Sequence, residues 1–209
     1  MLDKYITVFS EVEGGIIEKK SRFIANLFHV EDEKEAKEKI NEIKKKHYDA
    51  KHHVYAYRIY NDKNLLEKYS DDGEPAQTAG KPIMDLLKKK DIYNVLIVVT
   101  RYFGGILLGT GGLTRAYTQA ANVCVENSNV SNMVYSTIIH LCISYEQLDS
   151  IKHYCNSIDA IIIDIQYSDN ILLQVCVDNS QYDKVKQDIN NMLAGKVDFR
   201  GVSNKYVKK

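Results

Sequence analysis

Glycines and arginines are concentrated in one short stretch, RYFGGILLGTGGLTRAY, at residues 101–117. It holds five of the chain's eleven glycines between two arginines, and no acidic residue lies between Asp91 and Glu126. Exposed N–H groups at the start of a helix, with a guanidinium beside them, favour a phosphate or a carboxylate. We therefore predict an anion-binding loop, whose residues are Arg101, Gly104, Gly105, Gly109, Gly111, Gly112 and Arg115.

Neither of two nucleotide-binding fingerprints fits this loop. The spacing from Gly104 to Gly109 is that of a P-loop, but Thr110 and Gly111 follow where Lys-Ser/Thr is required. Thr114 occupies the third glycine position of a dinucleotide fingerprint, and no acidic residue follows at the ribose spacing. The alternative is that the glycines only permit unusual turns and close packing of a helix on a strand, and spacing alone leaves both interpretations open.

The same loop is expected to lead directly into a helix. We predict that Gly109, Gly111 and Gly112 immediately precede this helix and that Arg115 lies in its first turn. The anion then meets the positive end of the helix dipole.

An acidic cluster, DDGEP, supplies Asp71, Asp72 and Glu74. Three carboxylates in four residues can bind a hard cation or supply a general base. We favour an Asp-Gly turn whose acids lie near the start of the following helix, because no further acids have ligand-like spacing. No metal site and no cofactor are therefore expected.

The histidine pair His52-His53 lies on an expected strand, where alternate side chains face opposite sides, so only one of them can face a cleft. We choose His52 as the cleft residue. No serine or cysteine accompanies it as a nucleophile, which favours a hydrogen-bonding histidine over a catalytic one.

Composition describes an ordinary two-domain chain. The 209 residues carry 28 basic and 28 acidic side chains, a neutral balance that gives no global support for nucleic-acid binding. The N-terminus does not resemble a signal peptide, and the longest aliphatic run, residues 95–99, is far shorter than a membrane span. We expect a cytoplasmic protein without a membrane partner, whose four cysteines are free thiols.

The elements that must position these residues follow from hydrophobic periodicity. The first domain, residues 1–132, is expected to be α+β. It is expected to begin with strands within 4–30 joined near Gly14-Gly15, followed by a helix over 31–46 with a buried stripe of Ala36, Ile40 and Ile43. Strands at 52–60 and 64–70, joined by a turn at Asn61-Asp62, come next. A helix to about 89 with Pro82 in its first turn, a buried strand at 94–100 and a helix over 111–126 complete the domain.

The second domain, residues 133–209, shows the regular order βαββαβ. The economical packing of this order is a ferredoxin-like sandwich, in which two helices cover one face of a four-stranded antiparallel sheet.

Four motifs, in a fixed order along the chain, resemble those of a known protein family. They are KKSRFIA (19–25), YAYR (55–58) after His52, DDGEP followed by TAGKPI (78–83), and NVLIVVTRYFGGILLGTGGLTRAY (94–117). Together they resemble the YigZ/IMPACT family, and with residues 134–209 the chain resembles its bacterial two-domain YigZ type. We group Lys81 of TAGKPI with the anion-binding residues. Val54 stands where relatives often carry a cysteine, and Gln77 where a glycine is common.

The resemblance implies a fold and a setting. It implies that the first domain has the βαββ-type fold of the second domain of a small-subunit ribosomal protein, which a domain of elongation factor G shares. The two domains together look like the last two domains of that factor. Eukaryotic members regulate translation by binding a partner protein through an additional N-terminal domain, so that role is not carried over.

Three functional hypotheses follow. The one we favour is a translation-associated binding protein that contacts RNA or the ribosome through the glycine and arginine loop. The second is an enzyme for a small phosphorylated or carboxylated substrate, with Arg101 and Arg115 as anion clamps and a DDGEP acid as base or metal ligand. The third is a protein-interaction regulator that uses a sheet edge. The acids of DDGEP count against RNA, and they can themselves be the anion of the arginines in an internal ion-pair network.

Overall fold

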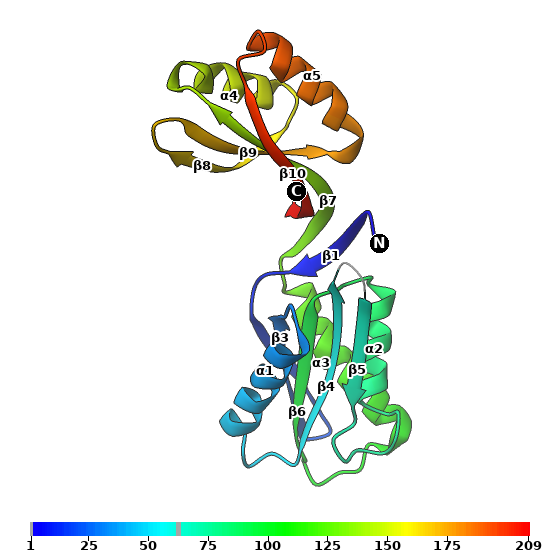
Figure 1. Cartoon of the computed structure of the whole chain (residues 1–209). Coiled ribbons are helices and arrows are strands. Elements are labelled where there is room, and N and C mark those ends of the chain that lie inside the picture. Colours follow the sequence, from blue (N-terminus) through cyan, green and yellow to red (C-terminus); the bar gives the residue numbers. More distant parts are fainter. Residues whose placement is uncertain (1, 62–63) are drawn as a thin grey trace. The chain divides into compact units, whose positions relative to one another are not determined.

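The computed structural model describes residues 2–61 and 64–209, which form two compact units (Figure 1). The first unit comprises residues 5–132, and the second comprises residues 2–4 and 133–209. The turn predicted at Asn61-Asp62 lies partly outside the described residues, since Asp62 is not among them. Among the described helices, none is both long and apolar enough to cross a membrane.

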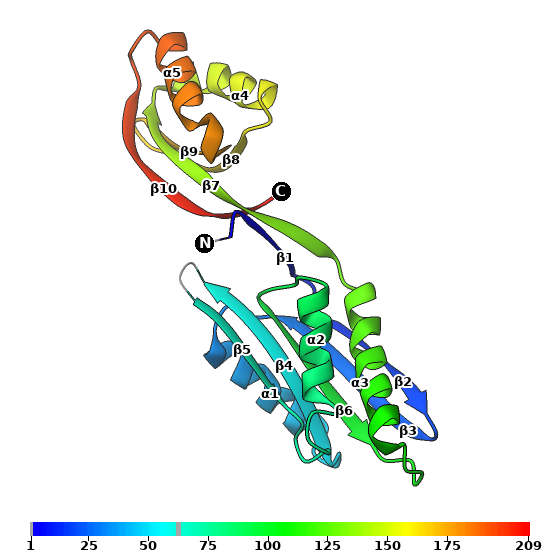
Figure 2. The same ribbon diagram turned by 90° about the vertical axis from the view of Figure 1, so that its right-hand side faces the viewer.

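The first unit is an antiparallel five-stranded sheet in the order β2-β3-β6-β4-β5, with helices on both faces (Figure 2). Its elements are β2 (Val12–Glu18), β3 (Ser21–His29), α1 (Glu33–Lys46), β4 (His52–Asn61), β5 (Asn64–Ser70), α2 (Gly80–Lys89), β6 (Val95–Tyr102) and α3 (Gly109–Glu126).

Strand β6 is the centre of the first unit and is buried on both faces. Val95, Ile97 and Val99 pack into one core with α2 and α3. Leu96 and Val98 point to the opposite face and pack against α1. A strand covered on both sides carries a continuous apolar run instead of an alternating one, which is why the sequence predicted this strand correctly.

Helix α1 also follows the sequence pattern. Ala36, Ile40 and Ile43 are its buried residues, as predicted. The Asp32 carboxylate accepts a 2.8 Å hydrogen bond from the N–H of Glu35 and caps the helix start.

The turn predicted at Gly14-Gly15 is wrong, because both glycines lie inside β2. The chain turns instead at Lys19 and Lys20, whose φ angles are 44° and 68°. A Cβ atom on Gly15 would lie 2.1 Å from the carbonyl oxygen of Phe23 on β3. The glycine is therefore required by the close approach of the neighbouring strand, not by a turn.

The predicted start of the helix that follows the glycine loop also needs correction. Helix α3 begins at Gly109, so Gly111 and Gly112 lie within its first turn and do not precede it. Arg115 lies in the second turn, not the first. Glycine has a low helix propensity, so this start is not evident from local preference.

The second unit confirms the predicted ferredoxin-like order. Its sheet has the antiparallel order β10-β7-β9-β8, and β1 also joins this sheet beside β7. Helices α4 and α5 pack on the sheet around Ile139, Leu173 and Val175. The elements are β7 (Val130–Ile143), a 3-10 turn (Tyr145–Gln147), α4 (Leu148–Ser157), β8 (Ile161–Tyr167), β9 (Ile171–Asp178), a 3-10 turn (Asn179–Gln181), α5 (Tyr182–Met192) and β10 (Asp198–Lys208). Of β1 (Lys4–Val8), only Lys4 belongs to this unit, and residues 130–132 of β7 belong to the first. The α+β fold class is thus as predicted, and the four cysteines are free thiols.

Candidate functional site

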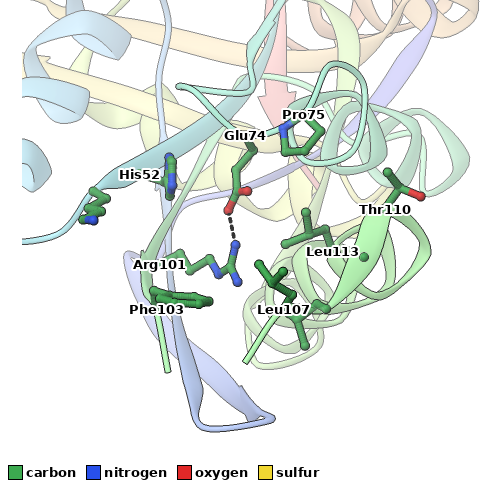
Figure 3. A pocket seen from close by; sticks show the side chains of 11 residues that line it. His52, Glu74, Pro75, Arg101, Phe103, Leu107, Thr110 and Leu113 are labelled. Atoms are coloured by element: carbon green, nitrogen blue, oxygen red, sulfur yellow. Dashed lines mark hydrogen bonds and ion pairs between the residues drawn. The ribbon is translucent and has the colours of Figure 1, made fainter. Parts of the chain in front are cut away.

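A pocket of about 440 Å³ lies in the first unit where the start of α3 meets the loop after β6, the start of β4 and the DDGEP loop (Figure 3). We call it the α3 pocket. It is lined by Lys51, His52, Glu74, Pro75, Arg101, Phe103, Leu107, Leu108, Gly109, Thr110 and Leu113.

A buried ion pair closes one side of the α3 pocket. Arg101 Nη1 donates to Glu74 Oε1 at 2.6 Å, and the two side chains are only 7% and 4% exposed. The Tyr117 hydroxyl donates to the same oxygen at 2.8 Å, and burial raises the pKa of that hydroxyl, so it stays protonated. The guanidinium of Arg101 is therefore neutralised internally by Glu74, as the internal-network alternative requires, and is not a free clamp.

The same guanidinium keeps one donor without a partner. Arg101 Nη2 lies 3.4 Å from Ser21 Oγ, but Nε is buried and finds no acceptor among the described residues. The guanidinium carbon lies 5.5 Å from the centroid of the Phe103 ring. The arginine thus combines structural contacts with an unsatisfied N–H.

The two aspartates of DDGEP have separate partners. Asp71 Oδ1 accepts from the N–H groups of Ala79 and Gly80, at 3.0 and 2.8 Å, so this carboxylate caps α2. Asp72 accepts from the N–H of His53 at 2.6 Å and from Lys44 Nζ at 3.2 Å. This is the turn with acids near a helix start that the sequence favoured.

A metal site does not assemble from these acids. Within residues 2–61 and 64–209, no three His, Cys, Asp or Glu side chains are placed to hold a metal ion. The DDGEP carboxylates are already used by backbone N–H groups, by Lys44 and by Arg101.

The two histidines face opposite ways. His52 lines the α3 pocket, and its Nδ1 lies 2.9 Å from the carbonyl oxygen of Asp72. A carbonyl only accepts, so Nδ1 carries a hydrogen and donates it to Asp72. His53 is buried, with Nε2 3.0 Å from the carbonyl oxygen of His47.

The five loop glycines differ in what their backbone requires. A Cβ on Gly104 would lie 2.0 Å from the carbonyl carbon of Lys20, whereas Gly105 and Gly109 have φ angles of +82° and +68°. A Cβ on Gly112 would lie 3.0 Å from that of Leu108. Gly111 has no such constraint, since its nearest neighbour would be Arg115 Nη1 at 3.6 Å. Packing and turns account for four glycines but not for Gly111.

Exposed cations surround this loop. Of these cations, the sequence analysis predicted only Arg115 as an anion-binding residue. The loop rests on the Lys19-Lys20 turn through Gly104, and Lys51 lines the α3 pocket. None of these cations forms an ion pair with a carboxylate in the described part of the chain. We call this set the cation rim, and its members are Lys19, Lys20, Lys51 and Arg115. The KK pair at the tip of a hairpin was the signal that could have found it.

Lys81 lies elsewhere. It is on α2, where its Nζ pairs with Asp85 Oδ2 at 3.0 Å, and it does not line the α3 pocket. Val54 is fully buried in the core beneath α2 and α3, so this position serves packing.

Gln77 stands where the family resemblance implies a glycine, and its backbone conformation is one that favours glycine. Its φ angle is +63°, and left-handed backbone costs an L residue roughly 1–2 kcal/mol. We expect Gln77→Gly to raise the free energy of unfolding by up to about 1 kcal/mol, after the added flexibility of the unfolded chain is subtracted. Urea unfolding of both proteins measures this, with Gln187→Gly on the ordinary helix α5 expected to be destabilising. A lower stability of Gln77→Gly would contradict the strain argument.

Comparisons with known proteins agree with this architecture. Residues 19–125 match the Impact N-terminal domain, and residues 141–196 match a domain of unknown function, DUF1949. The chain is 35% identical over 209 residues to IMPACT family member YvyE of Bacillus subtilis, covering 100% of this chain and 96% of that protein. It is 36% identical over 173 residues to IMPACT family member YigZ of Escherichia coli, covering 82% of each. A crystal structure of a hypothetical protein matches with a TM-score of 0.64 and 31% identity over 95% of this chain and 97% of that one.

Proposed function

We propose that this chain, which belongs to the IMPACT family, is a translation-associated protein whose first unit binds RNA on the ribosome. The observation that carries this proposal is the cation rim, a set of exposed cations around the loop between β6 and α3 that form no ion pair with described carboxylates. Cations of this kind are free to contact phosphates and to release counterions from RNA. The likeness to the last two domains of elongation factor G, which the family resemblance implies, favours the ribosome as the setting.

The objection from the DDGEP acids becomes weaker in the structure. Asp71 is surrounded by backbone N–H groups, Asp72 faces Lys44, and Glu74 is neutralised by Arg101. A carboxylate that is paired within the protein repels a nearby phosphate less than a free one does. The DDGEP acids therefore do not cancel the charge of the cation rim, although the chain as a whole is neutral.

The same pairing argues against the enzyme hypothesis in its original form. It required Arg101 as an anion clamp and a DDGEP acid as base or metal ligand. Arg101 and Glu74 compensate each other, and Asp71 caps a helix. We therefore assign the positive charge that meets RNA to the cation rim.

Ribosome co-sedimentation at increasing salt tests the proposal. The triple variant Lys19→Gln, Lys20→Gln, Arg115→Gln is expected to bind more weakly, and its slope of log affinity against log salt should be shallower by about 2, since each single-strand phosphate contact contributes about 0.7. The control is Lys34→Gln, Lys89→Gln, Lys184→Gln, which removes equal charge from exposed positions on three separate helices. No binding by the unmodified protein at low salt, or equal loss in both triple variants, would refute the proposal.

A further inference from the structure

We propose that the α3 pocket and the loop beside it form a docking site for a protein partner, which inserts one large apolar side chain next to an acidic residue. The loop comprises residues 103–108, FGGILL, and we call it the apolar loop. This inference goes beyond the proposed function, because a contact with phosphates makes no use of the apolar side chains of this loop.

The apolar loop exposes three large hydrophobic side chains within five residues. Phe103, Ile106 and Leu107 are 50%, 42% and 84% exposed. Single exposed apolar residues are normal on a protein surface, whereas a group of them marks a place where another molecule binds. The loop is also held in position, since the N–H of Gly104 donates to Ser21 Oγ at 3.1 Å. The apolar side chains are therefore presented on an anchored backbone.

The α3 pocket gives this apolar group a concave shape. Its volume of about 440 Å³ lies within the roughly 300–1,000 Å³ of sites that enclose a small ligand, so one aromatic or large aliphatic side chain fits into it. Figure 3 shows Phe103 on one side of the lining, and Leu107 and Leu113 on the other. Large side chains that fill such a pocket are the usual anchors of protein interfaces.

The buried charges of the α3 pocket compensate each other. Arg101 pairs with Glu74 at 2.6 Å, and the Tyr117 hydroxyl donates to the same carboxylate. A buried charge requires a partner of opposite charge, and here the protein itself provides it. An apolar side chain in the α3 pocket therefore deprives no buried charge of a partner, and the apolar walls favour it.

Charge complementarity indicates which residue lies next to the anchor. Lys51 lines the α3 pocket, is exposed and forms no ion pair with a carboxylate in the described part of the chain. The other members of the cation rim surround the loop, and no acidic residue occurs between Asp91 and Glu126. Complementary charge steers a partner to its site and suppresses wrong partners. An acidic residue beside the anchor is attracted by Lys51, and a basic residue there is repelled.

Phage display of random twelve-residue peptides against the full chain tests the inference. We expect the selected peptides to share one aromatic or large aliphatic residue next to an aspartate or a glutamate. Fluorescence anisotropy with the tightest of these peptides then measures affinity. Leu107→Ser should weaken binding by about tenfold or more through the loss of apolar contact. The matched control is Leu65→Ser, an exposed leucine on β5 outside the α3 pocket, which should leave the affinity unchanged.

A charge exchange tests the role of Lys51. Lys51→Glu should weaken the same peptide by at least about fivefold, because an attraction becomes a repulsion. Replacing the acidic residue of the peptide by lysine should restore binding to Lys51→Glu and weaken binding to the unmodified chain. A merely structural effect of Lys51→Glu would not be reversed by a change in the peptide.

Several outcomes overturn the inference. They are the selection of no binding peptide, a preference for basic peptides, and equal affinity of Leu107→Ser and the unmodified chain. Binding of phosphatidylserine vesicles or of single-stranded RNA that is lost in Leu107→Ser, with no peptide selected, would assign the apolar loop to a membrane or to RNA and also overturn it.

Ribosome binding tests the proposed function separately. It is expected to depend on Lys19, Lys20 and Arg115, which do not line the α3 pocket. Leu107→Ser keeps all of these charges, so its slope of log ribosome affinity against log salt should equal that of the unmodified chain. Failure of the peptide experiment therefore leaves the ribosome result standing, and the reverse also holds.

Discussion

Replacing Glu74 by alanine is expected to lower the free energy of unfolding by about 3–5 kcal/mol, because loss of one partner leaves a buried charge without compensation. Arg101 is 7% exposed and has Glu74 as its carboxylate partner in the described structure. The substitution also removes the acceptor of the Tyr117 hydroxyl, which lies 2.8 Å from the same carboxylate. Urea unfolding of the full chain, followed by far-ultraviolet circular dichroism, measures the change.

Two further variants make the test of this ion pair specific. The double variant Glu74→Leu, Arg101→Met removes both charges and is expected to lose less stability than Glu74→Ala, since apolar replacement of a whole buried pair is often neutral or stabilising. Asp85→Asn breaks the half-exposed Lys81–Asp85 pair on α2 and should change stability by less than about 1 kcal/mol. If Glu74→Ala cost no more than Asp85→Asn, the pair would not hold the site together.

Gly104→Ala is expected to destabilise the first unit at the upper end of the roughly 1–3 kcal/mol that overpacking costs. The new Cβ would lie 2.0 Å from the carbonyl carbon of Lys20 and 2.3 Å from the N atom of Ser21. Both are backbone atoms, so no side-chain rotation relieves the clash, and the loop must move away from the Lys19-Lys20 turn. We expect this variant to lose ribosome affinity as well as stability, because the turn carries Lys19 and Lys20 of the cation rim.

Gly111→Ala is the matched comparison for Gly104→Ala. Gly111 lies in the first turn of α3, and a Cβ there would meet only Arg115 Nη1, at an ordinary contact distance of 3.6 Å. Alanine there is expected to stabilise the helix by roughly 0.5–1 kcal/mol. Thermal unfolding should therefore shift in opposite directions for the two variants, and equal shifts would show that the contact with Lys20 does not explain Gly104.

The ion pair and the glycine contact hold the same end of the first unit by different means. Arg101 and Tyr117 connect β6 and α3 to the DDGEP loop through Glu74. Gly104 connects the following loop to the β2–β3 turn, where its N–H donates to Ser21 Oγ at 3.1 Å. The α3 pocket is therefore enclosed by segments that are each fixed to another part of the same unit.

The sequence by itself determined the elements whose signal is local. The stripe of Ala36, Ile40 and Ile43 predicted α1, and the β-branched run of β6 predicted a strand buried on both faces. The βαββαβ order of the second unit was predicted for the same reason. Hydrophobic periodicity is set by which side of one element is buried, and neighbouring residues suffice to show it.

Only the tertiary structure decided which residues form the site. Arg101 and Arg115 both flank the glycines in sequence, yet Arg101 is buried against Glu74 and Arg115 is exposed. Gly14-Gly15 has the composition of a turn, but its partner strand β3 requires glycine inside β2. Burial, ion pairing and close backbone approach depend on segments that are distant in sequence, so local composition is the same whether or not these contacts form.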